Sequence, residues 1–138
     1  MHYIFLTTII VLQLTGLIYC IIFIRKFTDF LNLVDSLKNK IDMEKFKKLV
    51  KENMYAALLN LVFLGSSWII YFIGFFLKIL GIIDFIFILI PAVLIVLFSL
   101  KLKSLEKMVQ KLPADNPVLE EESNMIVDIW LHKPFPNW

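Results

Sequence analysis

The side chains that could carry out chemistry are few in this sequence. Its 138 residues include two histidines, His2 and His132, and a single cysteine, Cys20. Catalysis needs a nucleophile beside a base, paired carboxylates, or several metal ligands in one place. The spacing of these residues suits none of these arrangements, and the sequence contains no glycine-rich phosphate loop or zinc-ligand pattern. We therefore expect a protein that is not an enzyme, with no metal and no cofactor, although a structural lipid is compatible with the sequence.

Two further sets of charged residues are explained by helix starts and turns without a catalytic or transport role. Three consecutive glutamates, 120–122, follow Asn116 and Pro117, and carboxylates are favourable in the first turn of a helix. Ionisable groups inside a membrane segment would indicate an ion or proton path. Lys78 and Asp84, however, flank a short turn, from which they can reach the membrane interface or pair with each other. We expect neither group to form a transport site.

Three long apolar runs must position all of these residues. They extend from Tyr3 to Ile24, from about Met54 to Leu77, and from about Ile82 to Leu100. A helix of roughly 20 residues crosses the roughly 30 Å of hydrocarbon in a bilayer. Hydrophobic residues make up 59% of the chain and charged residues 19%, against about 45–50% and 25% in soluble domains. The sequence therefore predicts an all-α integral membrane protein with three transmembrane helices.

The runs divide the chain into consecutive segments. We predict a first transmembrane helix, an inside amphipathic helical loop, a second transmembrane helix, an outer turn, a third transmembrane helix with an inside extension, and an inside tail. Their ranges are 1–25, 26–53, 54–78, 79–83, 84–112 and 113–138.

Basic residues are distributed unevenly among the connecting segments. Of the 14 lysines and arginines, all but Lys78 lie between the first two runs or after the third. Short loops rich in lysine and arginine stay on the cytoplasmic side of a membrane. We therefore predict an N-terminus outside and a C-terminus inside. The abundance of lysine, isoleucine and phenylalanine fits an AT-rich genome, so we expect a bacterial inner membrane, a thylakoid membrane or an organellar inner membrane.

The loop between the first two runs has the pattern of a helical hairpin. Steps of three and four between apolar residues predict an amphipathic helix from Lys26 to about Ile41. Asp42 is the expected N-cap of a second helix, which continues into the second span. The apolar stripes of the two helices comprise Phe27, Phe30, Leu31, Val34, Leu37 and Ile41 in the first, and Phe46, Leu49, Val50 and Met54 in the second. We expect the two stripes either to pack on each other or to lie on the membrane surface or a partner.

The tail is predicted to contain one more helix and an aromatic end. The third span should continue to Leu112 and stop at Pro113. Asn116 and Pro117 then predict the start of a short amphipathic helix that ends near Lys133. Its apolar arc comprises Val118, Leu119, Met125, Ile126, Ile129 and Trp130. The end of the tail is aromatic, and we expect Trp130, Phe135 and Trp138 either to dock on a partner or to lie at the lipid headgroups.

Uncharged polar and small residues within the spans are expected to pack helices together. In lipid, helices associate through close contact at small residues and through interhelical hydrogen bonds. This packing set comprises Gln13, Gly16, Asn60, Gly65, Ser66, Ser67 and Gly74. The helices that they join are either those of this chain or those of another protein. Pro91 lies in the middle of the third run and predicts a kink, because it frees the carbonyl of Phe87.

These features lead to one favoured function and two alternatives. We expect a small non-catalytic accessory, scaffold or assembly subunit of a larger membrane complex, docking through its inside helices and aromatic tail. Its partners would be membrane lipids and other membrane subunits, without nucleic acid, and a homo-oligomer is compatible with the sequence. The first alternative is a self-assembling pore, because the chain resembles one class of bacteriophage holins in its topology alone. The second is a stand-alone organiser of the lipid surface.

Overall fold

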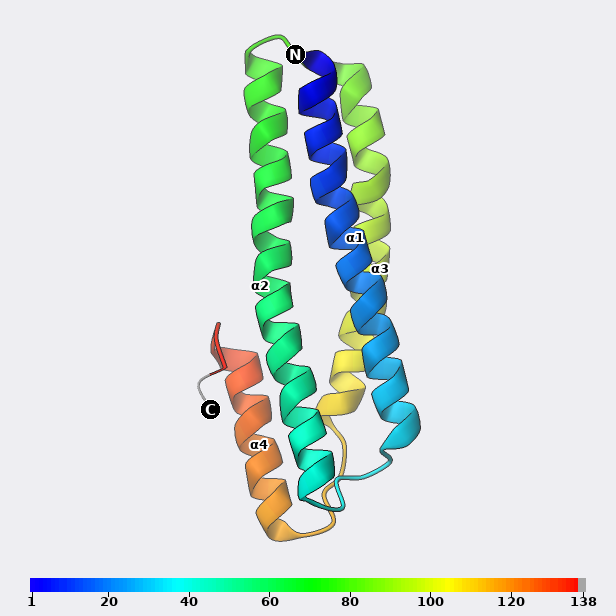
Figure 1. Ribbon diagram of the computed structural model, residues 1–138, viewed down its shortest axis with the longest axis vertical. Coiled ribbons are helices and arrows are strands. Elements are labelled where there is room, and N and C mark those ends of the chain that lie inside the picture. The colour runs from blue at the N-terminus through cyan, green and yellow to red at the C-terminus, as the bar shows by residue number, and fades with distance from the viewer. Residues whose placement is uncertain (137–138) are drawn as a thin grey trace. The chain divides into compact units, whose positions relative to one another are not determined.

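The computed structural model describes residues 1–136 and consists of four helices (Figure 1). They are α1 (His2–Leu33), α2 (Lys40–Phe76), α3 (Ile82–Gln110) and α4 (Pro117–His132). The first three are long and apolar enough to cross a membrane. Within the described residues there is no strand, and the only β-type pairing is an isolated bridge between Leu37 and Ala114. The predicted all-α class is confirmed, with three helices that are long and apolar enough to cross a membrane.

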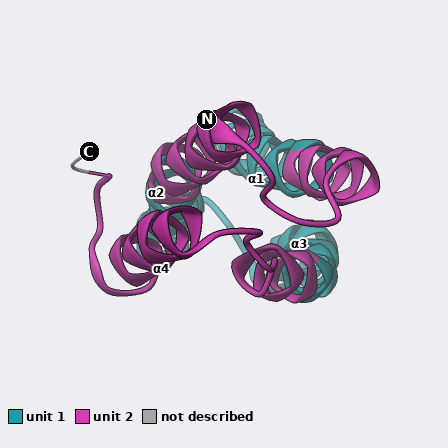
Figure 2. Ribbon diagram, turned by 90° about the horizontal axis from the view of Figure 1, so that it is seen from below, with its two compact units in different colours: residues 1–22, 59–101 teal, residues 23–58, 102–138 magenta. Residues whose placement is uncertain are grey.

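The chain forms two compact units, which are coloured separately in Figure 2. Unit 1 contains residues 1–22 and 59–101, so it holds the greater part of the three apolar runs. Unit 2 contains residues 23–58 and 102–138, which include the charged ends of those three helices and all of α4. Most of the buried hydrophobic side chains belong to unit 2. The two units therefore bury apolar surface to different extents.

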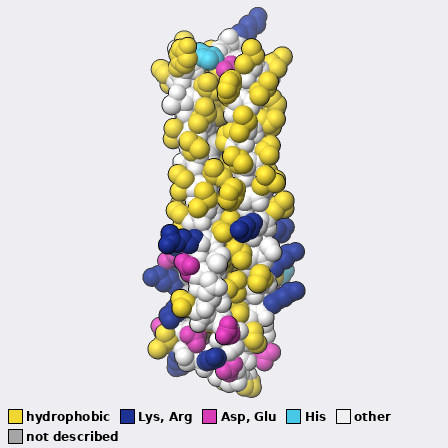
Figure 3. All heavy atoms as spheres, turned by 90° about the vertical axis from the view of Figure 1, so that its right-hand side faces the viewer, with side chains coloured by type: hydrophobic (Ala, Val, Ile, Leu, Met, Phe, Trp, Pro, Cys, Tyr) yellow, Lys and Arg dark blue, Asp and Glu magenta, His cyan; other side chains and the backbone are white. Residues whose placement is uncertain are grey.

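Unit 1 has a narrow core and an apolar exterior. Its buried cluster comprises Ile9 of α1, Tyr71 of α2, Ile88 of α3, and Leu80 of the turn between α2 and α3. Around this cluster most large hydrophobic side chains are exposed, and on the face in Figure 3 they form an almost continuous covering. A surface of this kind is unfavourable in water and suits a hydrocarbon surrounding.

Unit 2 is packed like a small helical domain. Its core lies between the end of α1, the start of α2, the end of α3 and one face of α4. Both predicted stripes supply this core, because Phe27, Phe30 and Val34 of the first and Phe46 and Val50 of the second are buried. The predicted packing of one stripe against its neighbour is thus supported by burial. Figure 2 shows α4 beside α2 in this unit.

The first helix of the hairpin ends earlier than expected. The structure ends α1 at Leu33, and Ile41, which was assigned to the buried stripe, is 63% exposed. Beyond the helix, the N–H of Leu37 donates to the carbonyl of Pro113 at 2.8 Å, and the carbonyl of Leu37 accepts from the N–H of Asp115 at 3.1 Å. A distant segment thus satisfies backbone groups that a longer helix would have paired locally.

The N-cap of α2 also differs from the prediction. Asn39, and not Asp42, precedes the helix, and its side-chain Oδ1 accepts a hydrogen bond from the N–H of Asp42 at 2.9 Å. Asp42 lies inside the first turn, where its carboxylate accepts from the N–H of Lys38 at 3.3 Å. The helix therefore begins three residues earlier than a cap at Asp42 would allow.

The tail helix starts where the sequence predicts. α3 ends at Gln110, before Pro113, and the side chain of Asn116 caps α4 by accepting from the N–H of Leu119 at 2.9 Å. The buried face of α4 is narrower than the predicted arc. It comprises Leu119, Ser123, Ile126 and Ile129, whereas Val118 and Met125 are exposed.

Candidate functional site

The end of unit 1 that carries the N-terminus holds a polar cluster that joins three parts of the chain. The Nε2 atom of His2 lies 3.0 Å from Oδ1 of Asp84, and Oδ2 of Asp84 accepts from the N–H of Gly81 at 2.7 Å. The pairing of Asp84 with Lys78, one of the two outcomes expected from sequence, is not formed. Lys78 is instead exposed and has a positive φ of 56°. A contact between residues 2 and 84 leaves no signal in local sequence, so sequence reasoning missed it.

Two amide side chains of unit 1 contain buried atoms without a hydrogen-bond partner. Gln13 is fully buried, and neither its Nε2 nor its Oε1 has a partner; Oδ1 of Asn60 is likewise unpartnered. Gln13 therefore forms no interhelical hydrogen bond, and Asn60 forms none through its Oδ1 atom. Asn60 instead contacts α1 at Gly16, where an added Cβ would lie 2.7 Å from Asn60 Oδ1. Gly16 is thus a point of close approach between α1 and α2.

The other predicted packing residues separate into two groups. A Cβ added at Gly74 would lie 2.7 Å from Cδ1 of Leu80, so this glycine is also tightly enclosed. Ser67 is buried, and its hydroxyl donates to the carbonyl of Leu64 at 2.7 Å. Gly65, in contrast, is exposed with open space around its Cβ position, and Ser66 is only partly buried. α3 continues as helix through Pro91, and the predicted kink there stays a prediction.

Unit 2 contains two polar links between helices that were not predicted. The amide of Asn53, which is 1% exposed, donates to Oε1 of Glu106 at 2.8 Å and so links α2 to α3. Lys26 of α1 donates to Oε2 of Glu52 of α2 at 2.6 Å. Both links join residues far apart in sequence. They restrict how the helix ends of this unit can pack.

The aromatic tail contacts this chain itself. Trp130 stacks on Phe27 with ring centroids 5.9 Å apart and planes inclined by 3°. Phe135 is half exposed, and its ring centroid lies 6.5 Å from that of Tyr55. Trp130 therefore contributes to the internal packing of unit 2, and its docking on a partner stays a prediction. Trp138, the third residue of that set, lies outside the described residues.

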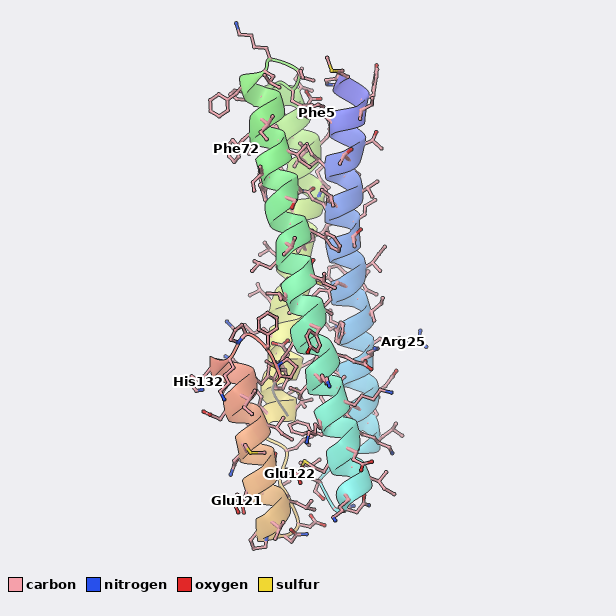
Figure 4. The ribbon with its side chains drawn as sticks, turned by 60° about the vertical axis from the view of Figure 1, so that its left-hand side comes forward. Phe5, Arg25, Phe72, Glu121, Glu122 and His132 are labelled. Atoms are coloured by element: carbon pink, nitrogen blue, oxygen red, sulfur yellow. The ribbon has the colours of Figure 1, made fainter. Side chains whose placement is uncertain are left out.

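One face of α4 is left uncovered by the rest of unit 2. Residues at steps of three and four form this outer face, and they comprise Val118, Glu121, Met125, Asp128 and His132. Val118 is 74% and Met125 is 49% exposed. His132 Nδ1 lies 2.9 Å from Oδ1 of Asp128. Figure 4 shows Glu121 and His132 on this helix. The α4 outer face is therefore apolar and acidic, and it is a candidate interaction surface of unit 2.

Comparison with known proteins adds no relative. No family model, curated protein or solved structure matches this chain. Within the described residues no three His, Cys, Asp or Glu side chains are grouped closely enough to hold a metal ion.

Proposed function

We propose that this protein is a small non-catalytic accessory, scaffold or assembly subunit of a larger membrane protein complex. The main observation is the combination of three helices apolar enough to cross a membrane with a packed helical unit that has an uncovered face on α4. The membrane helices would hold unit 2 at the bilayer surface. A partner would then bind the α4 outer face.

The proposed orientation places unit 2 inside and the N-terminus outside. Its support is the distribution of basic residues, because unit 2 contains Arg25 and most of the lysines, whereas Lys78 follows α2 at the opposite end of that helix. Lysine and arginine near membrane segments are retained on the cytoplasmic side. Figure 4 shows Arg25 pointing away from the helices, as a residue in contact with water or headgroups would.

The partner surface is proposed to be apolar and basic. Val118 and Met125 supply exposed apolar area, and Glu121 supplies a negative charge beside them. Complementary charge around an apolar centre favours a specific partner over other proteins. The inside loop has further exposed apolar residues, Leu33 and Ile41, which could extend the contact.

Polar residues in unit 1 favour this function over a self-assembling pore. A pore needs polar side chains along its channel, but Gln13 and Ser67 are buried within the unit and its exterior is apolar. The exposed threonines Thr8 and Thr15 donate their hydroxyls to carbonyls of their own helix, which makes them compatible with lipid.

The proposal is tested by co-purification of the full-length protein from its native membrane in a mild detergent. Wild type should retain stoichiometric partner subunits. Replacing both Val118 and Met125 by arginine should release them, because truncating or reversing a central anchor costs about 2 kcal/mol or more, roughly a thirtyfold loss of affinity.

The matched control is Met108→Arg, which changes an exposed apolar residue of unit 2 that lies on α3. It should leave the partners bound if the α4 outer face is the main contact. A homogeneous particle that contains only this chain would contradict the subunit proposal. Abrupt loss of membrane potential on expression would instead favour a pore.

A further inference from the structure

The exposed face of α2 changes its chemical character around Tyr55. Lys51 lies one turn before Tyr55 on the same side of the helix and is exposed. Tyr55 is 45% exposed, and the next residues on this face, Leu59 and Val62, are 56% and 55% exposed. Aromatic rings are enriched at the boundary between hydrocarbon and water, because they are apolar with a polar edge or tip. Tyr55 thus marks the level at which α2 would enter the hydrocarbon.

The end of the tail returns to this same place on α2. α4 stops at His132, where the N–H of Lys133 donates to the carbonyl of Ile129, and the chain then continues as Pro134 and Phe135 (Figure 1). The ring of Phe135 lies 6.5 Å from the ring of Tyr55, and Pro136 is buried. The tail therefore places a second half-exposed aromatic ring, that of Phe135, beside Tyr55. Lys133 lies two residues before Phe135.

The two lysines of this region are not neutralised by the protein. Lys51 and Lys133 are exposed, and within residues 1–136 neither is in an ion pair. The carboxylates nearest to them in sequence have other partners, since Glu52 pairs with Lys26 at 2.6 Å and Asp128 with His132 at 2.9 Å. Two exposed lysines outside ion pairs thus lie four and two residues, respectively, from the aromatic residues Tyr55 and Phe135 in sequence.

We propose that Lys51, Tyr55, Lys133 and Phe135 form a binding site for the headgroup of an anionic phospholipid, here called the headgroup site. Its lysines would donate to the phosphate oxygens, and the rings of Tyr55 and Phe135 would lie at the level of the glycerol and first methylenes. Lysine close to an anionic membrane surface contributes to binding, and aromatic rings favour the same depth. This role differs from the partner contact proposed for the α4 outer face, and neither depends on the other.

The experiment measures lipid retention by the full-length protein in detergent, with native mass spectrometry. Phosphatidylglycerol, phosphatidylcholine and inorganic phosphate are added in parallel. Wild type should retain phosphatidylglycerol in preference to phosphatidylcholine, and phosphate at equal concentration should not displace the lipid. Replacing Lys51 and Lys133 together by glutamine should weaken phosphatidylglycerol binding about thirtyfold, from the contributions of two lysines near the surface.

A matched control removes two other exposed lysines of unit 2, Lys40 and Lys111, again by replacement with glutamine. It lowers net charge equally but should keep the preference for phosphatidylglycerol. Equal loss in the two double variants, or no loss in either, would overturn the proposal. Phe135→Ala should also weaken lipid retention while keeping any protein partner. Loss of a protein partner with unchanged lipid binding would instead assign Phe135 to protein docking and overturn the headgroup site.

Discussion

At the scale of single residues, the most specific requirements lie at two glycines. Gly16 and Gly74 each leave no room for a Cβ, whereas Gly65 faces open space although all three are in apolar helices. Close approach of helices through small residues is a main source of association in lipid. The surroundings of a glycine, and not its presence in a span, therefore decide whether it holds unit 1 together.

Gly74→Ala should destabilise the protein, and Gly65→Ala should not. An alanine Cβ at Gly74 would lie 2.7 and 2.9 Å from two atoms of the buried Leu80 and 3.1 Å from Phe5, so the side chains must shift. Such overpacking typically costs about 1–3 kcal/mol. The measurement is the free energy of unfolding in detergent. Equal stability of the two variants would show that unit 1 is packed less closely at Gly74 than in the structure.

At the scale of elements, the contact of α4 with the rest of unit 2 depends on a few apolar side chains. Leu119, Ile126 and Ile129 are the buried apolar residues of α4, and Trp130 adds a ring stack on Phe27 of α1. Isolated helices of this length are marginal in water, so α4 depends on this packing for its stability. Loss of the contact would disturb the whole element and with it the α4 outer face.

Trp130→Ala should loosen α4, while Leu131→Ala should not. Removing the indole leaves a space beside Phe27 and loses the ring stack, a loss of about 2 kcal/mol or more. Leu131 is 59% exposed and serves as the control. Hydrogen exchange of the α4 amides should accelerate only in the Trp130 variant. Unchanged exchange combined with loss of a partner protein would assign Trp130 to partner docking instead.

At the scale of the whole molecule, the two units differ in the chemistry of their exterior and in the size of their core. Unit 1 has an apolar exterior with few buried side chains, and unit 2 has a larger core and exposed charged residues. The apolar exterior of unit 1 is compatible with a lipid surrounding, and the charged exterior of unit 2 is compatible with water. The proposed orientation, with unit 2 inside, is based on this difference and on the placement of the lysines.

Cysteine labelling with a membrane-impermeant reagent tests that orientation. In a Cys20→Ser background, Ile82→Cys should react in intact cells, whereas Lys40→Cys and Lys103→Cys should react only after permeabilisation. These positions are suitable because all three side chains are exposed, and that of Ile82 is 75% exposed. Leu80, in the turn before α3, is unsuitable because it is only 3% exposed. The reverse pattern would invert the orientation and place unit 2 outside.

Local sequence determined the features of this protein that depend on neighbouring residues. Apolar runs of sufficient length specify the three long helices, because a helix satisfies its backbone groups within the segment itself. The stripe that includes Phe46 and Val50 specifies which face is buried, and Asn116 before Pro117 specifies where α4 begins. Each of these signals is contained within a few turns of one helix.

Only the tertiary structure decided the features that depend on residues distant in sequence. The helix boundary at Leu33 reflects backbone hydrogen bonds of Leu37 with residues 113 and 115. The partner of Asp84 is His2, and the partner of Trp130 is Phe27, although either aromatic residue could have faced lipid or another protein. Many different pairings satisfy the same local pattern, and the packing of the whole chain selects one of them.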